Sequence, residues 1–252
     1  MKRSWGLQSS LPDDIALKIA SLLPVQFPTP VPDVCALGSC SRFWRELCGS
    51  NCIWQSLAKE RWPYLAQFEE SSSSSTATNP PISKGWRGFY IKRHREMEGR
   101  AAAVTEFLER CSLTASLDVG DYLKAIEDLH TMQLGFKDVQ MFLFNPKRNV
   151  LLNLVGLAYC IYWLGVPGEY VVEELENCKI SARRVCVKWW KLGRWFHGFR
   201  MRDESHSRWV SLADLAKAKE QEVLIVLQRG AIHEVLCVQI SAADPTCTPW
   251  SC

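Results

Sequence analysis

The apolar residues of the N-terminal quarter are spaced as in short amphipathic helices. In the segment 12–23 they recur at i, i+4, i+7 and i+8 on an otherwise polar stretch, which aligns them along one helix face. They are Ile15, Ile19, Leu22 and Leu23. Pro12 suits a first helical turn because it has no N–H to leave unpaired, and Asp13 and Asp14 favour the positive end of the helix dipole. This pattern predicts a helix that begins at Pro12.

Two further short helices are expected before Ser50. Pro32 and Asp33 repeat the start signal, and Gly49 is a typical helix end. The apolar side chains of these helices are Val34, Cys35 and Leu37 in the first and Phe43, Trp44 and Leu47 in the second. Three helices of this length bury little surface on their own, so we expect a partner protein to cover some of these side chains.

A Ser- and Pro-rich stretch separates this helical module from the rest of the chain. Ser71 to Ser75 run together, and Pro80 and Pro81 follow shortly after. Such a segment has almost nothing to bury, so it predicts a mobile linker. The expected domains are a helical module at residues 9–62, a linker at 63–83 and a second domain at 84–252.

The second domain is expected to begin with helices. Apolar residues recur three or four positions apart in several segments, which gives each segment one apolar face. These segments are 86–111, 122–130, 137–144 and 150–164. The last is the most apolar stretch of the chain, but Asn153 interrupts it and it is shorter than the roughly 20 residues of a membrane crossing. We therefore expect a buried core helix.

After the helices, the hydrophobic period changes to two, as in a half-buried strand. Val185, Val187 and Trp189 share one face, and Arg184, Cys186 and Lys188 share the other. Turn residues then predict further strands. These are expected at 194–202, 208–212, 222–228 and 232–240. The predicted fold class is α+β, with a three-helix N-terminal module followed by a helical segment packed on a C-terminal antiparallel sheet.

The N-terminal module resembles an F-box. The anchors that carry the resemblance are Leu11 to Ile15, Ile19, Leu22 to Pro24, Asp33 to Leu37, Ser41 to Leu47, and Trp54. The resemblance implies binding to a Skp-type adaptor and, through it, to a cullin. It also implies which residues share the adaptor contact and the small internal core: Leu11, Pro12, Ile15, Leu23, Val34, Leu37, Trp44, Leu47 and Trp54. The chain departs from the family pattern at Val25–Val31, which lengthens a usually short connection.

The resemblance further implies a non-catalytic substrate-recognition subunit of an SCF-type (Skp–cullin–F-box) ubiquitin ligase. The second domain would then bind an unknown target protein. No internal repeat is apparent in that domain, which is similar to many plant F-box proteins. Two alternatives stay open: a scaffold that binds the adaptor without directing degradation, and a helical hairpin that only caps the second domain.

One stretch of the second domain, Arg183 to Arg202, interleaves basic and aromatic side chains. Tryptophan rings can stack on nucleic-acid bases, and neighbouring arginines can bind phosphate groups. This combination is typical of a protein that binds nucleic acid or phosphopeptides. The candidate binding residues are Trp189, Trp190, Trp195, Arg194 and Arg200. The other interpretation is that the alternation places the rings in the core and the cations in water. The net charge of only +3 favours this second interpretation, so nucleic acid is not an expected partner.

The remaining chemistry-bearing residues do not form a recognisable catalytic or metal site. Cys35, Cys40, Cys48 and Cys52 lie close together, but without the paired spacing of a zinc site. No phosphate loop, nucleophile elbow or carboxylate pair is apparent, so we expect neither an enzyme nor a cofactor. The 11 cysteines, with no secretory leader, favour reduced thiols and a location in the nucleus or cytoplasm.

Overall fold

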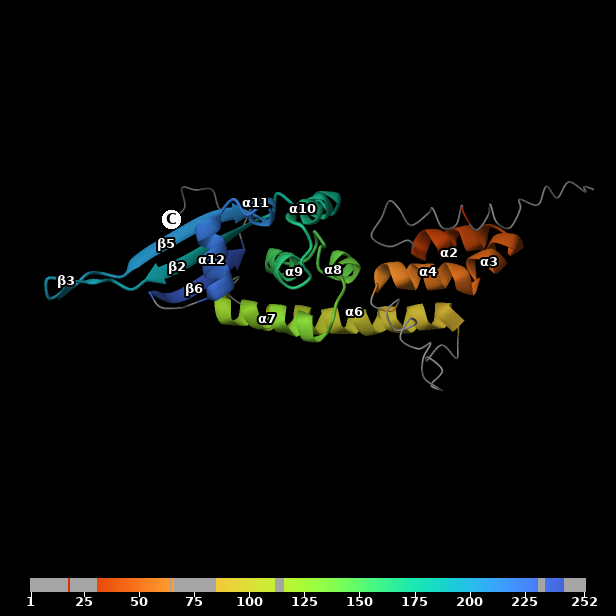
Figure 1. Ribbon diagram of the computed structural model, residues 1–252, viewed down its shortest axis with the longest axis horizontal. Helices are drawn as coiled ribbons and strands as arrows, with labels where there is room; N and C mark the ends of the chain where they lie inside the picture. The colour runs from red at the N-terminus through yellow and green to blue at the C-terminus, as the bar shows by residue number, and fades with distance from the viewer. Residues whose placement is uncertain are drawn as a thin grey trace, which may run out of the picture. The chain divides into compact units, whose positions relative to one another are not determined.

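A computed structural model describes the fold at residues 18, 31–63, 65, 85–111, 116–230 and 234–242. Packing divides the chain into two compact units, Met1–Arg95 and Glu96–Cys252. The division lies within a long helix, α6 (Gly85–Cys111), whereas the predicted domain boundary lies just before it (Figure 1). The predicted first helix and linker lie outside the described residues, apart from Lys18, which is helical, and residues 63 and 65.

In the described part of the N-terminal unit, three short helices precede α6. They are α2 (Val31–Cys40), α3 (Arg42–Cys48) and α4 (Asn51–Arg61). The hydroxyl of Ser41 fixes the start of α3 by accepting a hydrogen bond from the N–H of Trp44 at 3.2 Å. Gly49 ends this helix and donates its N–H to the carbonyl of Arg45 at 3.0 Å. The two helices predicted at Pro32 and Phe43 are therefore confirmed, and α4 is an additional helix that the pattern did not predict.

An aromatic cluster forms the core of this unit. Trp54 and Trp62 are buried, and their ring centroids lie 5.4 and 5.1 Å from that of Tyr90. The indole N–H of Trp54 donates to the carbonyl of Cys48 at 2.7 Å, so its polar atom is satisfied inside the core. The buried guanidinium of Arg61 lies over the ring of Trp62 and donates to the hydroxyl of Tyr90 at 3.0 Å. These contacts join α4 to the first half of α6.

The C-terminal unit combines helices with an antiparallel sheet. After β1 (Ser116–Asp118) come α7 (Val119–Thr131), α8 (Phe136–Phe142), α9 (Val150–Tyr162) and α10 (Gly168–Asn177). They are followed by β2 (Arg184–Lys191), β3 (Trp195–Phe196), β4 (Phe199–Arg200), β5 (Glu204–Ser211), α11 (Leu212–Ala216), α12 (Gln221–Arg229) and β6 (Val235–Ala242). The main sheet has the order β1-β6-β2-β5, and β3 pairs with β4 in a separate two-stranded sheet. The predicted α+β class is confirmed.

Helix α9 is the centre of this unit. All of its residues from 150 to 160 are buried, and it contacts the sheet strands β2 and β6 and the helices α7, α8, α10 and α11. Asn153 is buried within it, donates to the carbonyl of Leu143 at 2.5 Å and accepts a hydrogen bond from Arg183. Asn153, which interrupts the apolar run, therefore has hydrogen-bond partners in the core and connects α9 to the segments before and after it.

Three of the predicted strands are corrected by the structure. The segment 222–228 lies in helix α12, because Val223, Leu224, Val226 and Leu227 are buried on one helical face. The predicted strand 208–212 is part of a longer one, because β5 begins at Glu204 and pairs with β2 over its whole length. The segment 194–202 contains two short strands and a turn at His197 and Gly198, both of which have positive φ. A two-residue turn of this kind matches the twist of a hairpin.

Candidate protein-binding surfaces

Two of the expected adaptor-contact residues belong to the core of the N-terminal unit. Val34 and Trp54 are 1% and 2% exposed, so neither side chain presents a surface to a partner. Leu11, Pro12, Ile15 and Leu23 lie outside the described residues. Among the candidate residues that the structure describes, Val34 and Trp54 therefore belong to the core, and Leu37, Trp44 and Leu47 remain as candidates for the adaptor contact.

The accessible apolar residues gather on and beside α3. Leu37, Trp44 and Leu47 are half-buried, and Phe43 is exposed. The rings of Phe43 and Trp44 pack edge to face, with centroids 5.4 Å apart. Phe43 belongs to the predicted apolar face of this helix, although the F-box resemblance does not place it among the expected contact residues. Its exposure beside Trp44 gives α3 an aromatic surface of the kind that protein interfaces favour.

A hollow of about 260 Å³ lies within the N-terminal unit. Its lining combines helix side chains with two glycines: Val34, Cys35, Gly38, Ser39, Arg45, Cys48, Gly49, Trp54 and Arg87. Burial and the nearby Cys35 and Cys40 raise the pKa of the Cys48 thiol, which keeps it protonated and poorly nucleophilic. Across the described ranges, no group of His, Cys, Asp and Glu side chains is arranged to hold a metal ion.

The basic-aromatic stretch of the C-terminal unit divides between core and surface. Val185, Val187 and Trp189 on β2 are fully buried, as the alternating pattern predicted. Trp189 stacks on His206 of the neighbouring strand, with ring centroids 5.4 Å apart. Trp189 is therefore wrong as a candidate binding residue, because the side of β2 that it shares with the two valines faces the core.

The opposite face of β2 is only partly covered. Trp190 is half-buried, and the ammonium of Lys188 lies 4.9 Å from the centroid of its ring. Cys186 on the same face lies directly across from Trp209 of β5, whose side chain is exposed. This face is open to solvent in the described part of the sheet, and Trp190 remains available to a ligand only in part.

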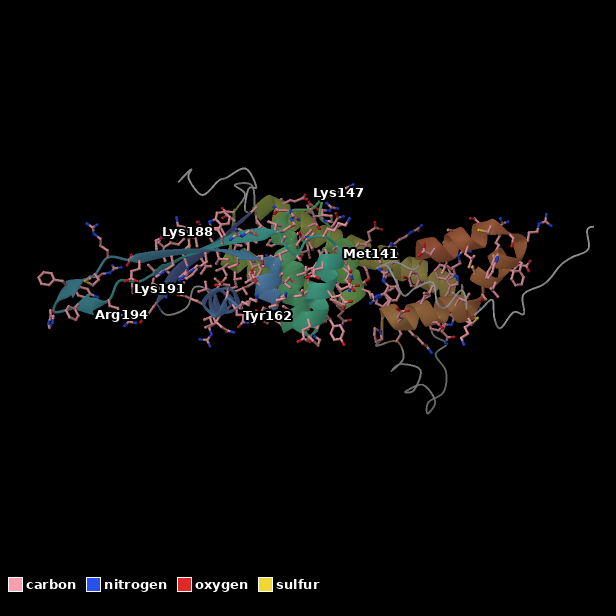
Figure 2. The ribbon with its side chains drawn as sticks, turned by 90° about the horizontal axis from the view of Figure 1, so that it is seen from above. Met141, Lys147, Tyr162, Lys188, Lys191 and Arg194 are labelled. Carbon is pink, nitrogen blue, oxygen red and sulfur yellow. The ribbon has the colours of Figure 1, made fainter. Side chains whose placement is uncertain are left out.

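Beyond the main sheet, β3 and β4 form a hairpin arm, which we define as residues 191–203. Figure 1 shows β3 at the far end of the strands β2 and β5, and Figure 2 shows Lys188, Lys191 and Arg194 following one another from β2 into the arm. Trp195 and Arg200 lie directly across from each other in the hairpin, and both are exposed. The candidate residues Arg194, Trp195 and Arg200 therefore meet on the arm, apart from Trp189 and Trp190 on the main sheet.

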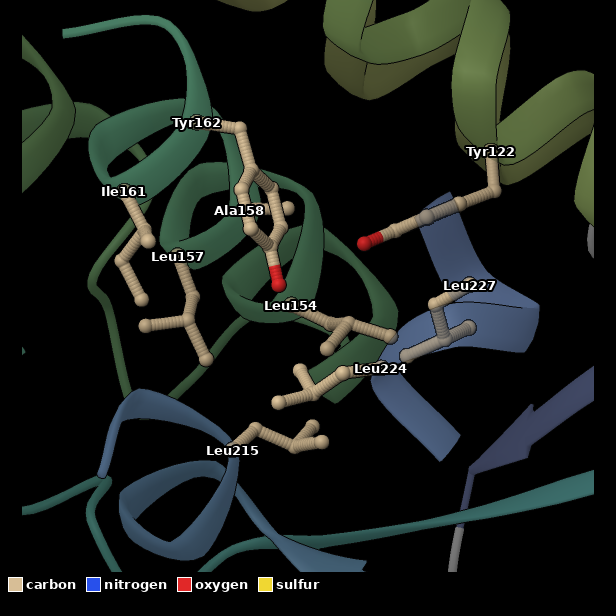
Figure 3. Close-up of a pocket in the computed structure, with 9 residues that line it drawn as sticks. All are labelled: Tyr122, Leu154, Leu157, Ala158, Ile161, Tyr162, Leu215, Leu224 and Leu227. Atoms are coloured by element: carbon tan, nitrogen blue, oxygen red, sulfur yellow. The ribbon is translucent and has the colours of Figure 1, made fainter. Parts of the chain in front are cut away.

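The described interior of the C-terminal unit contains a small cavity. A cavity between α7, α9, α11 and α12 has a volume of about 10 Å³, which is room for a single water molecule (Figure 3). Its lining is apolar except for the hydroxyls of Tyr122 and Tyr162, and burial raises the pKa of both phenols. Burial also raises the pKa of the Cys160 thiol on α9. These groups are suited to packing rather than to acid–base or nucleophilic chemistry at neutral pH.

None of the helices within the described ranges combines the length and the apolar character of a membrane crossing. Comparison with protein families finds a match to the F-box-like model at residues 8–60. No curated protein and no solved structure matches the chain. The matched segment contains the described helices α2, α3 and most of α4. The chain therefore carries an F-box-like domain at residues 8–60, which supports a general adaptor-binding role in SCF assemblies.

Proposed function

We propose that this chain is a substrate-recognition subunit of an SCF-type ubiquitin ligase. The N-terminal helices bind a Skp-type adaptor, which links the chain to a cullin, and the unit Glu96–Cys252 binds the target protein. The observation that carries the proposal is the F-box-like match at residues 8–60 followed by a second compact unit with its own core. A chain that only capped or stabilised the adaptor would not need this second unit.

The proposed function requires no active site in this chain. Binding a target beside a charged ubiquitin-conjugating enzyme raises the effective concentration of its lysines, and the transfer is then catalysed by other subunits. The proposed subunit is therefore a receptor rather than an enzyme. The surface of α3 supports the adaptor contact, because Phe43 and Trp44 present aromatic side chains outside the core.

A double variant at the start of the module tests the proposal. Leu11→Ala with Pro12→Ala removes two of the residues that the F-box resemblance assigns to the adaptor contact. We expect the variant chain to lose co-purification with a Skp-type adaptor and a cullin, while proteins bound by the C-terminal unit are retained. The lifetime of those retained proteins in cells should increase, since they are no longer brought to the ligase.

The matched control is Tyr170→Ala, which truncates an exposed side chain on α10 of the other unit. This variant should keep the adaptor and the cullin. If the double variant lost the adaptor while the retained proteins kept their normal lifetime, the chain would act as a scaffold that does not direct degradation. If the double variant kept the adaptor, the proposed use of Leu11 and Pro12 would be wrong.

A further inference from the structure

The arm at residues 191–203 is a built hairpin rather than a loose loop. Its tip, Trp195–Arg200, pairs Trp195 with Arg200 and Phe196 with Phe199 around the turn at His197 and Gly198. The N–H of Met201 donates to the carbonyl of Arg194 at 2.9 Å, which continues the pairing toward the main sheet. The backbone of the tip is therefore ordered by hydrogen bonds before any ligand arrives, which lowers the entropy cost of binding.

The base of the arm is closely packed. A Cβ atom on Gly193 would overlap the carbonyl oxygen of Met201 and would lie 2.7 Å from that of Arg202, so only glycine fits there. The carboxylate of Asp203 accepts hydrogen bonds from the N–H of Gly193 at 2.9 Å and from Arg200 at 3.0 Å. The tip is thus held at a fixed place beyond the ends of β2 and β5.

Large apolar side chains at the tip, and Met201 beside it, are exposed to solvent. The exposed fractions are 72% for Trp195, 65% for Phe196, 77% for Phe199 and 59% for Met201. Because paired residues share a face, Phe196 and Phe199 lie on one face of the hairpin and Trp195 lies on the other. Apolar groups on both faces suit insertion into a concave surface, which covers both faces at once. Trp, Phe, Met and Arg are also the residue types enriched at the centres of protein interfaces.

The charges around the tip indicate what else the ligand carries. Among the described residues, Arg194 and Arg200 each bond through one terminal nitrogen, toward Glu234 and Asp203, which leaves further N–H donors of each guanidinium group for a ligand. Within the described ranges, no ion pair joins Arg202 to a carboxylate. Exposed ion pairs contribute little, so a ligand carboxylate can compete for these arginines.

The acidic residues at the base of the arm argue against a polyphosphate or an anionic membrane as the ligand. Asp203 and Glu234 pair with Arg200 and Arg194, and Glu204, which follows Asp203 in the chain, is exposed. They would repel a dense row of phosphates. In addition, Arg200 lies directly across from Trp195, so insertion of the tip into acyl chains would bury a charged guanidinium group. A protein ligand can instead place a single carboxylate within hydrogen-bond distance of each arginine.

We propose that the tip of this arm is the target-binding element, and that its ligand is a segment of the target protein that combines large apolar side chains with Asp or Glu. This inference rests on the proposed function, because it assigns the target site of the same receptor. Trp195, Phe196, Phe199 and Met201 supply the apolar anchors, and Arg194, Arg200 and Arg202 pair with the carboxylates at the edge of the contact.

The test uses the full chain and a phage-displayed library of random peptides as the probe. Peptides selected on the natural chain should be enriched in Asp and Glu beside large apolar residues. Their affinity should fall about tenfold or more for the double variant Trp195→Ala with Phe199→Ala, which is the effect typical of truncating interface anchors. The control Tyr170→Ala truncates an exposed aromatic side chain outside the arm, and this variant should bind these peptides unchanged.

A second variant, Arg202→Glu, tests the charge without removing an apolar anchor. It should weaken binding of the acidic peptides. When the Asp and Glu of these peptides are replaced by Lys and Arg, the Arg202→Glu chain should bind them more tightly than the natural chain does. The thermal unfolding midpoint of each variant is measured alongside, and because these side chains are exposed we expect it to match that of the natural chain. Binding of a purified Skp-type adaptor is measured on the same samples.

The outcomes are distinct. If the adaptor binds but the library yields no enriched peptide, or yields peptides that bind both tip variants normally, the inference is overturned while the proposed function stands. Tip-dependent binding of phosphatidylcholine–phosphatidylserine vesicles or of a single-stranded oligonucleotide, without peptide binding, also overturns it. The same holds for tip-dependent self-association by light scattering. If the adaptor fails to bind the natural chain, the proposed function itself is wrong.

Discussion

The carboxylate of Asp203 accepts a hydrogen bond from the backbone N–H of Gly193 at 2.9 Å, and this bond joins the two strands of the arm at its base. The absence of a side chain at Gly193 lets the carbonyl groups of Met201 and Arg202 approach closely. The position of the tip therefore depends on one charged acceptor and one glycine that lie outside it. Both can be changed without altering the exposed aromatic residues.

Substitution of Gly193 by alanine should deform the base of the arm. The added methyl group overlaps the carbonyl of Met201, so the strands must separate and the bond to Asp203 must lengthen or break. Overpacking of this kind costs about 1–3 kcal/mol. We expect faster hydrogen–deuterium exchange at the amides of residues 193–203, together with weaker binding of any peptide that requires the tip.

Gly99→Ala is the control for this substitution. Gly99 lies in the interior of α6, and a Cβ atom there meets nothing within 4 Å. Alanine should therefore stabilise the chain by about 0.5–1 kcal/mol, because it reduces the backbone entropy lost on folding. Exchange in the arm that is equally slow in both variants would show that the close packing at Gly193 is not important.

Acid should loosen the base of the arm. The hydrogen bond from Gly193, aided by Arg200, lowers the pKa of the Asp203 carboxyl below its ordinary value of 3.8. A carboxyl whose pKa is lowered in the folded state stabilises that state fully above its ordinary pKa, and this contribution is lost as the pH falls through the folded-state pKa. We expect the amide chemical shift of Gly193 to change in that acidic range and to stay constant near neutral pH.

The Asp203→Asn variant distinguishes the titration of Asp203 from that of other carboxyl groups whose pKa is lowered. Asp214 and Glu222 also have lowered pKa values, owing to the hydroxyl of Ser211 and the ammonium of Lys191 respectively. The amide resonance of Gly193 should no longer follow the pH in the Asn variant, whereas Asp214 and Glu222 still titrate. An unchanged titration of the Gly193 amide in this variant would assign the effect to another carboxyl.

The alternating pattern of β2 predicted its buried face, but not the arm that follows. Val185, Val187 and Trp189 could be placed because a period of two has a simple geometric meaning in a paired strand. The turn at His197 and Gly198 divides the predicted strand 194–202, and Gly198 was the local signal that could have located it. Once this turn is placed, Phe196 and Phe199 become cross-strand partners.

Other features depend on packing that a single sequence does not reveal. The run from Val223 to Leu227 is apolar and β-branched, which favours a strand, yet it forms α12 because a helical face fits against α7 and α9. Arg61 is buried against Trp62 and Tyr90, and Tyr90 lies far along the chain. No local pattern around Arg61 indicates that partner.

Removal of the polar group of Asn153 should destabilise the C-terminal unit more than its size suggests. Asn153→Leu leaves the carbonyl of Leu143 and the guanidinium of Arg183 without this partner, inside or beside the core. An unpaired buried polar group costs about 1–3 kcal/mol, and more when it is charged. We expect a clear fall in the free energy of unfolding, measured by urea denaturation followed by circular dichroism.

Asn149→Ala provides the comparison, since Asn149 caps the same helix at its exposed end and accepts a hydrogen bond from the N–H of Leu151 at 3.0 Å. Loss of a cap of this kind costs about 1 kcal/mol. The Leu variant at position 153 should therefore be the less stable of the two. The opposite order would mean that leucine is accommodated in the core and that the link to Arg183 contributes little.

Two tryptophans of the F-box-like domain should separate folding from adaptor binding. Trp54 is buried against Tyr90, so Trp54→Ala should destabilise the N-terminal unit by about 3–5 kcal/mol, as large-to-small core substitutions do. Trp44 is half-buried beside the exposed Phe43, so Trp44→Ala should change the unfolding midpoint much less. If α3 contacts the adaptor, Trp44→Ala should nevertheless weaken that binding about tenfold or more, as truncation of an interface anchor does.

The measurement is a titration of a purified Skp-type adaptor against each variant, with circular dichroism melting of the same samples. Adaptor binding by the Trp54 variant is then compared below its own unfolding midpoint, so that loss of fold is not mistaken for loss of contact. Normal adaptor affinity in Trp44→Ala would remove the surface of α3 from the proposed contact. It would leave the first part of the matched segment, including Leu11 and Pro12, as the remaining candidate, because Val34 and Trp54 are enclosed by their own unit.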